Sequence, residues 1–101
     1  MMSVHEFVED LKKHGYSVKF NARVKGMSGQ VHQVDGLAEH AKEKTIVWLE
    51  KRGDPTAEII GIFAIAYDAG AEACYVADSR ELGEEERKLA ESYKMRLLAR
   101  R

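Results

Sequence analysis

The chain has 101 residues, 45% of them hydrophobic, and carries 16 Lys and Arg against 17 Asp and Glu, a formal net charge of −1. This length suits one compact domain with one modest core, so residues 1–101 are expected to form a single domain. The balanced charge excludes a positive field over the whole molecule, and any nucleic-acid binding must come from a local patch. The single cysteine, Cys74, excludes a disulfide framework within one chain.

The sequence predicts a soluble protein with no membrane partner. Its longest apolar run, residues 59–66, is far shorter than the roughly 20 residues that a membrane span needs. The N-terminus carries acidic residues where a signal peptide would carry an apolar block, which indicates an intracellular, cytoplasmic location. The 33% content of charged residues, combined with one proline, is typical of proteins from thermophiles.

The first elements follow from a change in hydrophobic period. Apolar residues at i, i+3, i+4 and i+7 predict a helix over residues 3–14, with Ser3 as the N-cap and Gly15 as the stop. From Tyr16 the pattern changes to strict alternation. That alternation predicts a half-buried strand over residues 16–24.

Two more strands are predicted at residues 30–38 and 44–51. The connection between them, residues 39–43, is short enough for a hairpin, so the first three strands are expected to form a meander. Asp54 and Pro55 then mark the start of a helix over residues 55–69. This helix is apolar nearly all round, which predicts that it is buried on most faces.

The remaining elements are short. A buried strand is predicted at residues 73–77, an amphipathic helix at residues 83–93, and a last edge strand at residues 95–98. The resulting order is helix, three strands, helix, strand, helix, strand. Written in symbols, this is αβββαβαβ.

This order and several local motifs resemble one known family. The matching motifs are His14-Gly15-Tyr16, the Gly26-Met27-Ser28-Gly29 turn leading to His32 and Asp35, the third strand ending in Lys51, and Ala73-Cys74-Tyr75-Val76-Ala77 before a helix. Together they resemble the Mrr-type catalytic domain of the PD-(D/E)XK restriction-endonuclease superfamily, in a minimal archaeal-style version that covers nearly the whole chain. The resemblance implies an α/β fold with a restriction-endonuclease-like core and a mixed sheet with helices on both faces.

The same resemblance implies a Mg²⁺-dependent DNA endonuclease. In such a site, convergent carboxylates hold the metal ion, which activates water and neutralises the charge on the phosphate. Asp35 and Glu50 would be the metal ligands, and Lys51 would stabilise charge beside the metal. Glu6, or alternatively Glu9, from the first helix would complete the catalytic set.

One position departs from the family pattern. If the hairpin is centred near residue 41 or 42, Asp35 lies opposite residues 47–49, which places Leu49 at the position where the family has its acidic residue. Leucine cannot bind a metal ion. Glu50, one residue further, would point to the other face of the sheet unless a β-bulge turns it back.

Two functions from different classes therefore remain open. One is a DNA-directed protein, either an active endonuclease or a degenerate relative, working as a homodimer that addresses two strands. The other is a non-catalytic interaction or assembly module with the same fold, which Leu49 and the near-neutral charge favour. For the first, the residues predicted to contact phosphates are Lys19, Arg23, Lys25, Lys42, Lys44 and Arg52.

Overall fold

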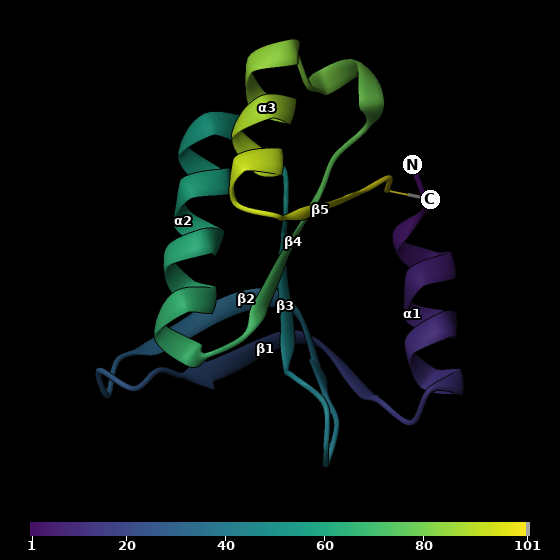
Figure 1. The fold of residues 1–101 in the computed structure, drawn as a ribbon, viewed down its shortest axis with the longest axis vertical. Coiled ribbons are helices and arrows are strands. Elements are labelled where there is room, and N and C mark those ends of the chain that lie inside the picture. Colours follow the sequence, from purple (N-terminus) through teal and green to yellow (C-terminus); the bar gives the residue numbers. More distant parts are fainter. Residues whose placement is uncertain (101) are drawn as a thin grey trace.

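A computed structural model describes residues 1–100 as one α/β unit (Figure 1). Its five-stranded sheet has the order β1-β2-β3-β4-β5. A short 3₁₀ turn, η1, lies between β4 and α3. In chain order the elements are α1 (Val4–Lys13), β1 (Ser17–Lys25), β2 (Val31–Glu39), β3 (Ile46–Glu50), α2 (Pro55–Ala69), β4 (Glu72–Val76), η1 (Ser79–Glu81), α3 (Glu84–Ser92) and β5 (Arg96–Leu98).

The predicted α/β class and the predicted order of helices and strands are confirmed. Each predicted element is present, and its ends differ from the prediction by at most two residues. The sequence patterns did not predict η1, which is a single turn and too short to show a period. Within residues 1–100, no helix combines the length and the apolar character needed to cross a membrane.

The sheet is mixed, and both of its faces are covered. β1, β2 and β3 pair antiparallel, whereas β3, β4 and β5 pair parallel. Figure 1 shows α1 on one side of the sheet and α2 and α3 on the other. Each side has its own core: an α1-side cluster that includes Phe7, Leu11 and Trp48, and an α2-side cluster that includes Ile59 and Ile62.

Local capping signals fix the helix ends where the sequence predicts them. Ser3 and Glu6 form a reciprocal capping box at the start of α1, each side chain accepting a 3.1 Å hydrogen bond from the other's backbone N–H. Asp54 caps α2 by accepting a hydrogen bond from the Ala57 N–H. Gly70 ends α2 in the left-handed region, at a φ of 65°.

Strand β1 contributes to both cores. Val18 packs with the α1-side cluster, whereas Ala22 and Val24 pack with the α2-side cluster. Asn21 lies between the two halves with a φ of 49°, a conformation that asparagine adopts more readily than most residues. The far half of the β1–β2 hairpin therefore belongs to the α2 side of the molecule.

The tip of that hairpin is fastened to the C-terminal end of α2 by Asp68. The Asp68 carboxylate accepts hydrogen bonds from the Ser28 N–H and hydroxyl, and His32 Nε2 lies 2.7 Å from Oδ2. These contacts, led by His32, lower the pKa of Asp68 to about 2. Gly26 is required beside them, because a Cβ at that position would overlap the Asp68 carboxylate.

Candidate functional site

Asp35 lies where strands β2 and β3 separate. The last paired residues before it are Gly36 and Trp48. Continuing this register places Asp35 opposite Leu49, within the range of residues 47–49 that the sequence predicts. Beyond Gly36 and Trp48, a side chain takes the place of the backbone pairing between the two strands. The Glu50 backbone N–H donates a 2.6 Å hydrogen bond to Asp35 Oδ2. The Asp35 side chain therefore takes part in the hydrogen bonding at the end of the β2–β3 pairing.

The Asp35 carboxylate also forms a two-pronged ion pair with Arg52. Arg52 donates from its two terminal nitrogens to the two carboxylate oxygens at 2.6 and 2.8 Å. Partial burial raises the pKa of Asp35, but the hydrogen bonds from Arg52 and from the Glu50 N–H outweigh it, so the pKa lies below its usual value. The same pair raises the pKa of Arg52.

Glu50 lies close in sequence but points to the other face of the sheet. Strand β3 pairs with β4 in unbroken register from Ile46 to Glu50, so no bulge turns Glu50 back. Trp48, two residues earlier, packs in the α1-side cluster, whereas Leu37, two residues after Asp35, packs in the α2-side cluster. Strand alternation therefore separates the two predicted metal ligands.

The Glu50 carboxylate is held by an arginine of its own. Arg100 donates to Glu50 Oε1 at 2.6 Å, to the Lys51 carbonyl at 2.9 Å and to Glu81 Oε1 at 3.2 Å. Lys51 points toward the same acidic group, with its Nζ 3.6 Å from Glu81 Oε2. Glu50 and Lys51 thus belong to one ionic network, in which Arg100 pairs with Glu50 and Glu81 and Lys51 pairs with Glu81, and Asp35 is not part of it.

Glu6, the fourth predicted catalytic residue, serves α1 instead. Its carboxylate accepts the Ser3 backbone N–H in the capping box, a hydrogen bond that lowers the pKa of Glu6. The described residues show no contact between Glu6 and Asp35. The four predicted catalytic side chains are therefore not brought together at one point.

This arrangement does not fit a divalent metal ion. Mg²⁺ in proteins takes carboxylates whose oxygens are free to converge on the ion. Here each candidate carboxylate already faces a guanidinium, and no group of three or more His, Cys, Asp or Glu side chains within residues 1–100 is arranged to hold a metal. The structure therefore supports no catalytic step through a metal.

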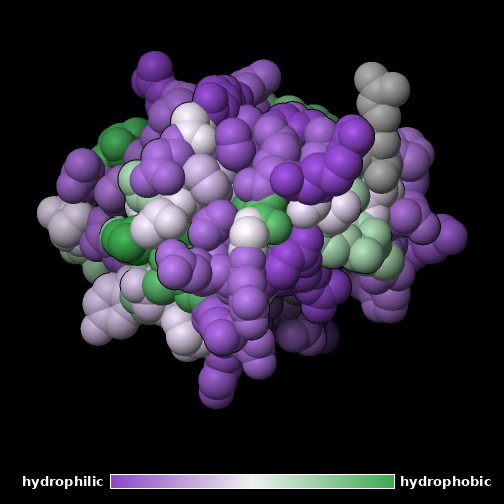
Figure 2. Space-filling model, turned by 90° about the horizontal axis from the view of Figure 1, so that it is seen from above, coloured by the Kyte–Doolittle hydropathy of each residue, from purple (hydrophilic) through white to green (hydrophobic). Residues whose placement is uncertain are grey.

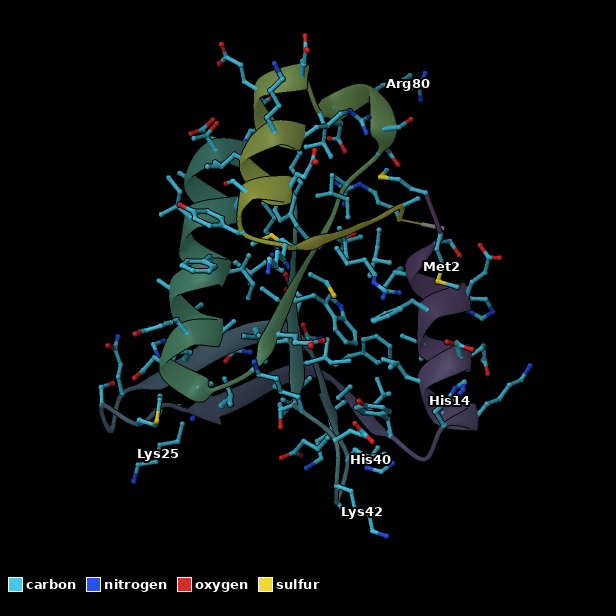
Figure 3. The ribbon with its side chains drawn as sticks, in the orientation of Figure 1. Met2, His14, Lys25, His40, Lys42 and Arg80 are labelled. Atoms are coloured by element: carbon cyan, nitrogen blue, oxygen red, sulfur yellow. The ribbon has the colours of Figure 1, made fainter. Side chains whose placement is uncertain are left out.

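The predicted phosphate contacts divide into two groups. Arg52 is committed to Asp35, whereas Lys19, Arg23 and Lys25 are exposed along β1 and form no ion pair within the described residues. These three line a shallow groove of about 600 Å³ on the hairpin. Lys42 and Lys44 are exposed in the β2–β3 connection, and Figure 3 shows Lys25 and Lys42 extending into solvent at the same end of the molecule.

Sequence reasoning missed a second polar group beside Asp35. Glu58, in the first turn of α2, accepts hydrogen bonds from the Arg52 and Gly53 backbone N–H groups and a 2.6 Å hydrogen bond from the Tyr75 hydroxyl. Burial and this hydrogen bond raise the pKa of Tyr75. Glu58 therefore holds the loop that presents Arg52 to Asp35. A first-turn acid is a sequence signal, but its partners become neighbours only in the folded chain.

No family model and no curated protein matches this chain.

Proposed function

We propose that this chain is a nucleic-acid-binding domain with a restriction-endonuclease-like fold of the PD-(D/E)XK superfamily, and that it is a degenerate relative without nuclease activity. The order αβββαβαβ and the mixed sheet support the fold. One observation supports the loss of activity above all others. Asp35, the carboxylate at the expected metal position, forms a bidentate ion pair with the Arg52 guanidinium.

The exposed cations of β1 support nucleic-acid binding. Arg23 and Lys25 lie two residues apart in the half of β1 beyond Asn21, so their side chains share a face, and Lys19 lies in the other half of the same strand. Such a row neutralises backbone phosphates without reading base sequence. Because the whole chain has a net charge of −1, attraction of a polyanion must come from a local group of cations such as this one.

Binding is tested with a fluorescent DNA of about 20 nucleotides, single-stranded and duplex, followed by anisotropy. The wild type should bind more weakly as salt rises from about 50 to 200 mM, because counterions are released on binding. Arg23→Glu should weaken binding by about tenfold or more, since it replaces an attraction to phosphate with a repulsion.

Arg80→Glu is the matched control. Arg80 is exposed, and Figure 3 places it at the opposite end of the molecule from Lys25. The control should retain wild-type affinity. Equal losses in the two variants, or no binding by the wild type, would reject the nucleic-acid proposal and favour the interaction module.

Loss of catalysis is tested separately. We expect no cleavage of supercoiled plasmid or of the labelled DNA by the wild type with either Mg²⁺ or Mn²⁺, because residues 1–100 contain no convergent ligand set. Cleavage by the wild type that Asp35→Asn abolishes would instead show an active endonuclease. In that case the Asp35–Arg52 pair must open when substrate binds.

A further inference from the structure

Beyond Asn21, the β1–β2 hairpin leaves one face of the sheet open. Ala22 and Val24 pack in the α2-side cluster, so Arg23 and Lys25, which alternate with them, lie on the α1 side. Both cations are exposed there. Figure 1 shows that the hairpin tip extends below α2 and away from α1. Helix α1 therefore does not cover this part of its own side of the sheet.

Strand β2 completes the open face. The register places Gln33 opposite Arg23 and Val31 opposite Lys25. Directly opposite residues of an antiparallel pair share a face of the sheet. Gln33 is exposed, and Val31 is 55% exposed. The four side chains therefore form one exposed surface, and none of them is acidic.

An exposed aromatic ring borders this surface. Phe20 lies two residues after Val18, which packs in the α1-side cluster, and its ring centroid is 6.2 Å from that of Trp48 in the same cluster. The two rings meet edge-on, and Phe20 is still 58% exposed. We call the combined surface the hairpin face. It consists of Phe20, Arg23, Lys25, Val31 and Gln33.

The charge around Phe20 suits an anionic ligand. The groove that Phe20 lines along β1 is also lined by three cations, Lys19, Arg23 and Lys25, and by one acid, Glu39. The opposite end of the molecule has a different surface, which Figure 2 shows to be covered mostly by hydrophilic residues. The hairpin face therefore combines an exposed aromatic ring with a local excess of positive charge.

This combination is the one that proteins use to hold single-stranded nucleic acid. The bases of a duplex stack on one another, so a protein surface reaches mainly phosphates and groove edges. The bases of a single strand are free to stack on aromatic side chains, while nearby cations neutralise the phosphates. An exposed ring beside cations on one face of a sheet offers both contacts.

We propose that the hairpin face binds single-stranded nucleic acid, with one base stacked on Phe20 and the neighbouring phosphates on Arg23 and Lys25. The inference rests on the proposed nucleic-acid binding and names the form of nucleic acid that the β1 cations hold. Stacking is tolerant of base identity, because every base has an aromatic face, so recognition is of the strand and not of its sequence.

The test compares three probes of about 20 nucleotides by fluorescence anisotropy. They are an oligothymidylate, a strand of the same length that lacks bases, and a duplex. The wild type should bind the oligothymidylate about tenfold more tightly than the strand without bases, because the two carry the same phosphates and only the first can stack.

Phe20→Leu removes the ring and keeps an apolar side chain. Its affinity for the oligothymidylate should fall by about tenfold, since stacking on an aromatic side chain is lost. Its affinities for the strand without bases and for the duplex should not change. Phe20→Tyr keeps a ring and should bind like the wild type. Because Phe20 is exposed, circular dichroism should show an unchanged fold in both variants.

Tyr67→Leu is the matched control, because Tyr67 is a 76% exposed aromatic residue on α2, on the other side of the sheet. It should bind all three probes like the wild type. Equal binding of the two single strands by the wild type would overturn the inference. A loss in Phe20→Leu that the duplex or Tyr67→Leu shares would also overturn it.

Arg23→Glu separates this inference from the proposed function. If Arg23→Glu weakens binding and Phe20→Leu does not, the chain binds nucleic acid without stacking, and only the inference is rejected. If the wild type binds none of the three probes, both are rejected.

Discussion

At the residue scale, Asp35 is held by donors of two kinds. The Glu50 backbone N–H and the Arg52 guanidinium both donate to its carboxylate. Asp35 is only 15% exposed, whereas Arg52 is 64% exposed. Burial alone would favour the neutral acid, so the ionised form depends on these donors. Arg52 is thus the side chain that lowers the pKa of this carboxylate against the effect of burial.

Replacing Arg52 should therefore change both stability and titration. We expect Arg52→Met to lower the free energy of unfolding at neutral pH by about 1 kcal/mol, a small value because the arginine is solvent-screened. The pKa of Asp35 should rise, since burial remains while the arginine is lost. A lowered carboxyl pKa stabilises the fold above the unfolded value, so the deficit should shrink as pH falls below about 4.

Urea unfolding at several pH values and an NMR titration of the Asp35 carboxyl carbon check this expectation. Arg80→Met is the control, because Arg80 is exposed and forms no ion pair within residues 1–100. An unchanged Asp35 titration in Arg52→Met would contradict the role given to the ion pair.

The sequence identified these residues but not their pairing. Asp35 and Arg52 were predicted as a metal ligand and a phosphate contact, because each was interpreted by residue type. Their ion pair depends on where β2 and β3 separate, and no local pattern encodes that point. The contact between Arg100 and Glu50 is still harder to predict from the sequence, because the two residues are 50 positions apart.

At the element scale, Gly36 sets the fit between β2 and β3. A Cβ at Gly36 would overlap the indole ring of Trp48, whereas a Cβ at Gly61 in α2 would meet open space. We expect Gly36→Ala to destabilise the fold by about 3 kcal/mol through overpacking. Gly61→Ala should instead stabilise it by about 0.5–1 kcal/mol through helix propensity. Urea unfolding at one fixed protein concentration measures both, and similar effects of the two substitutions would contradict this difference.

The contacts of Asp68 with Ser28 and His32, which we call the hairpin clasp, predict that stability depends on pH. The pKa of Asp68 is about 2, below its usual value, so the clasp stabilises the fold above pH about 4 and is lost as pH falls toward 2. Asp68→Asn should therefore melt at a lower temperature than the wild type at neutral pH. The two melting temperatures should converge in acid.

Thermal melts from pH 7 to pH 2 measure this difference, with Glu91→Gln as the control for loss of an exposed carboxylate. A gap between wild type and Asp68→Asn that persists at the lowest pH would show that the asparagine acts through packing and not through charge.

Most elements could be predicted because their signals are local. The period of apolar residues, the Ser3 and Asp54 caps and the glycine stops each act within a few residues. The turn at Asn21 could not be predicted in this way. Alternation along β1 is continuous, so the sequence pattern does not reveal that its two halves pack in different clusters.

At the scale of the whole molecule, the sequence predicts the α/β class and the mixed sheet but not what each face contacts. Helix α2 illustrates the reason, because the expectation that it is buried on most faces is not met. Ile62 is buried, whereas Ile60 is 46% exposed and Tyr67 is 76% exposed. All three are hydrophobic, so only the folded chain shows which side of the helix is uncovered. Likewise, the six predicted phosphate contacts are alike in sequence. In the folded chain Arg52 forms an ion pair with Asp35, whereas the cations of β1 are exposed.

The divided packing of β1 has a consequence for how the protein opens. Val18 belongs to one core and Ala22 and Val24 to the other, so neither core can loosen without disturbing the same strand. Amide hydrogen exchange should therefore report a single cooperative unit, in which buried amides on both sides of the sheet exchange with the same opening free energy. Faster exchange confined to one side would show that Asn21 acts as a hinge between two independently opening halves.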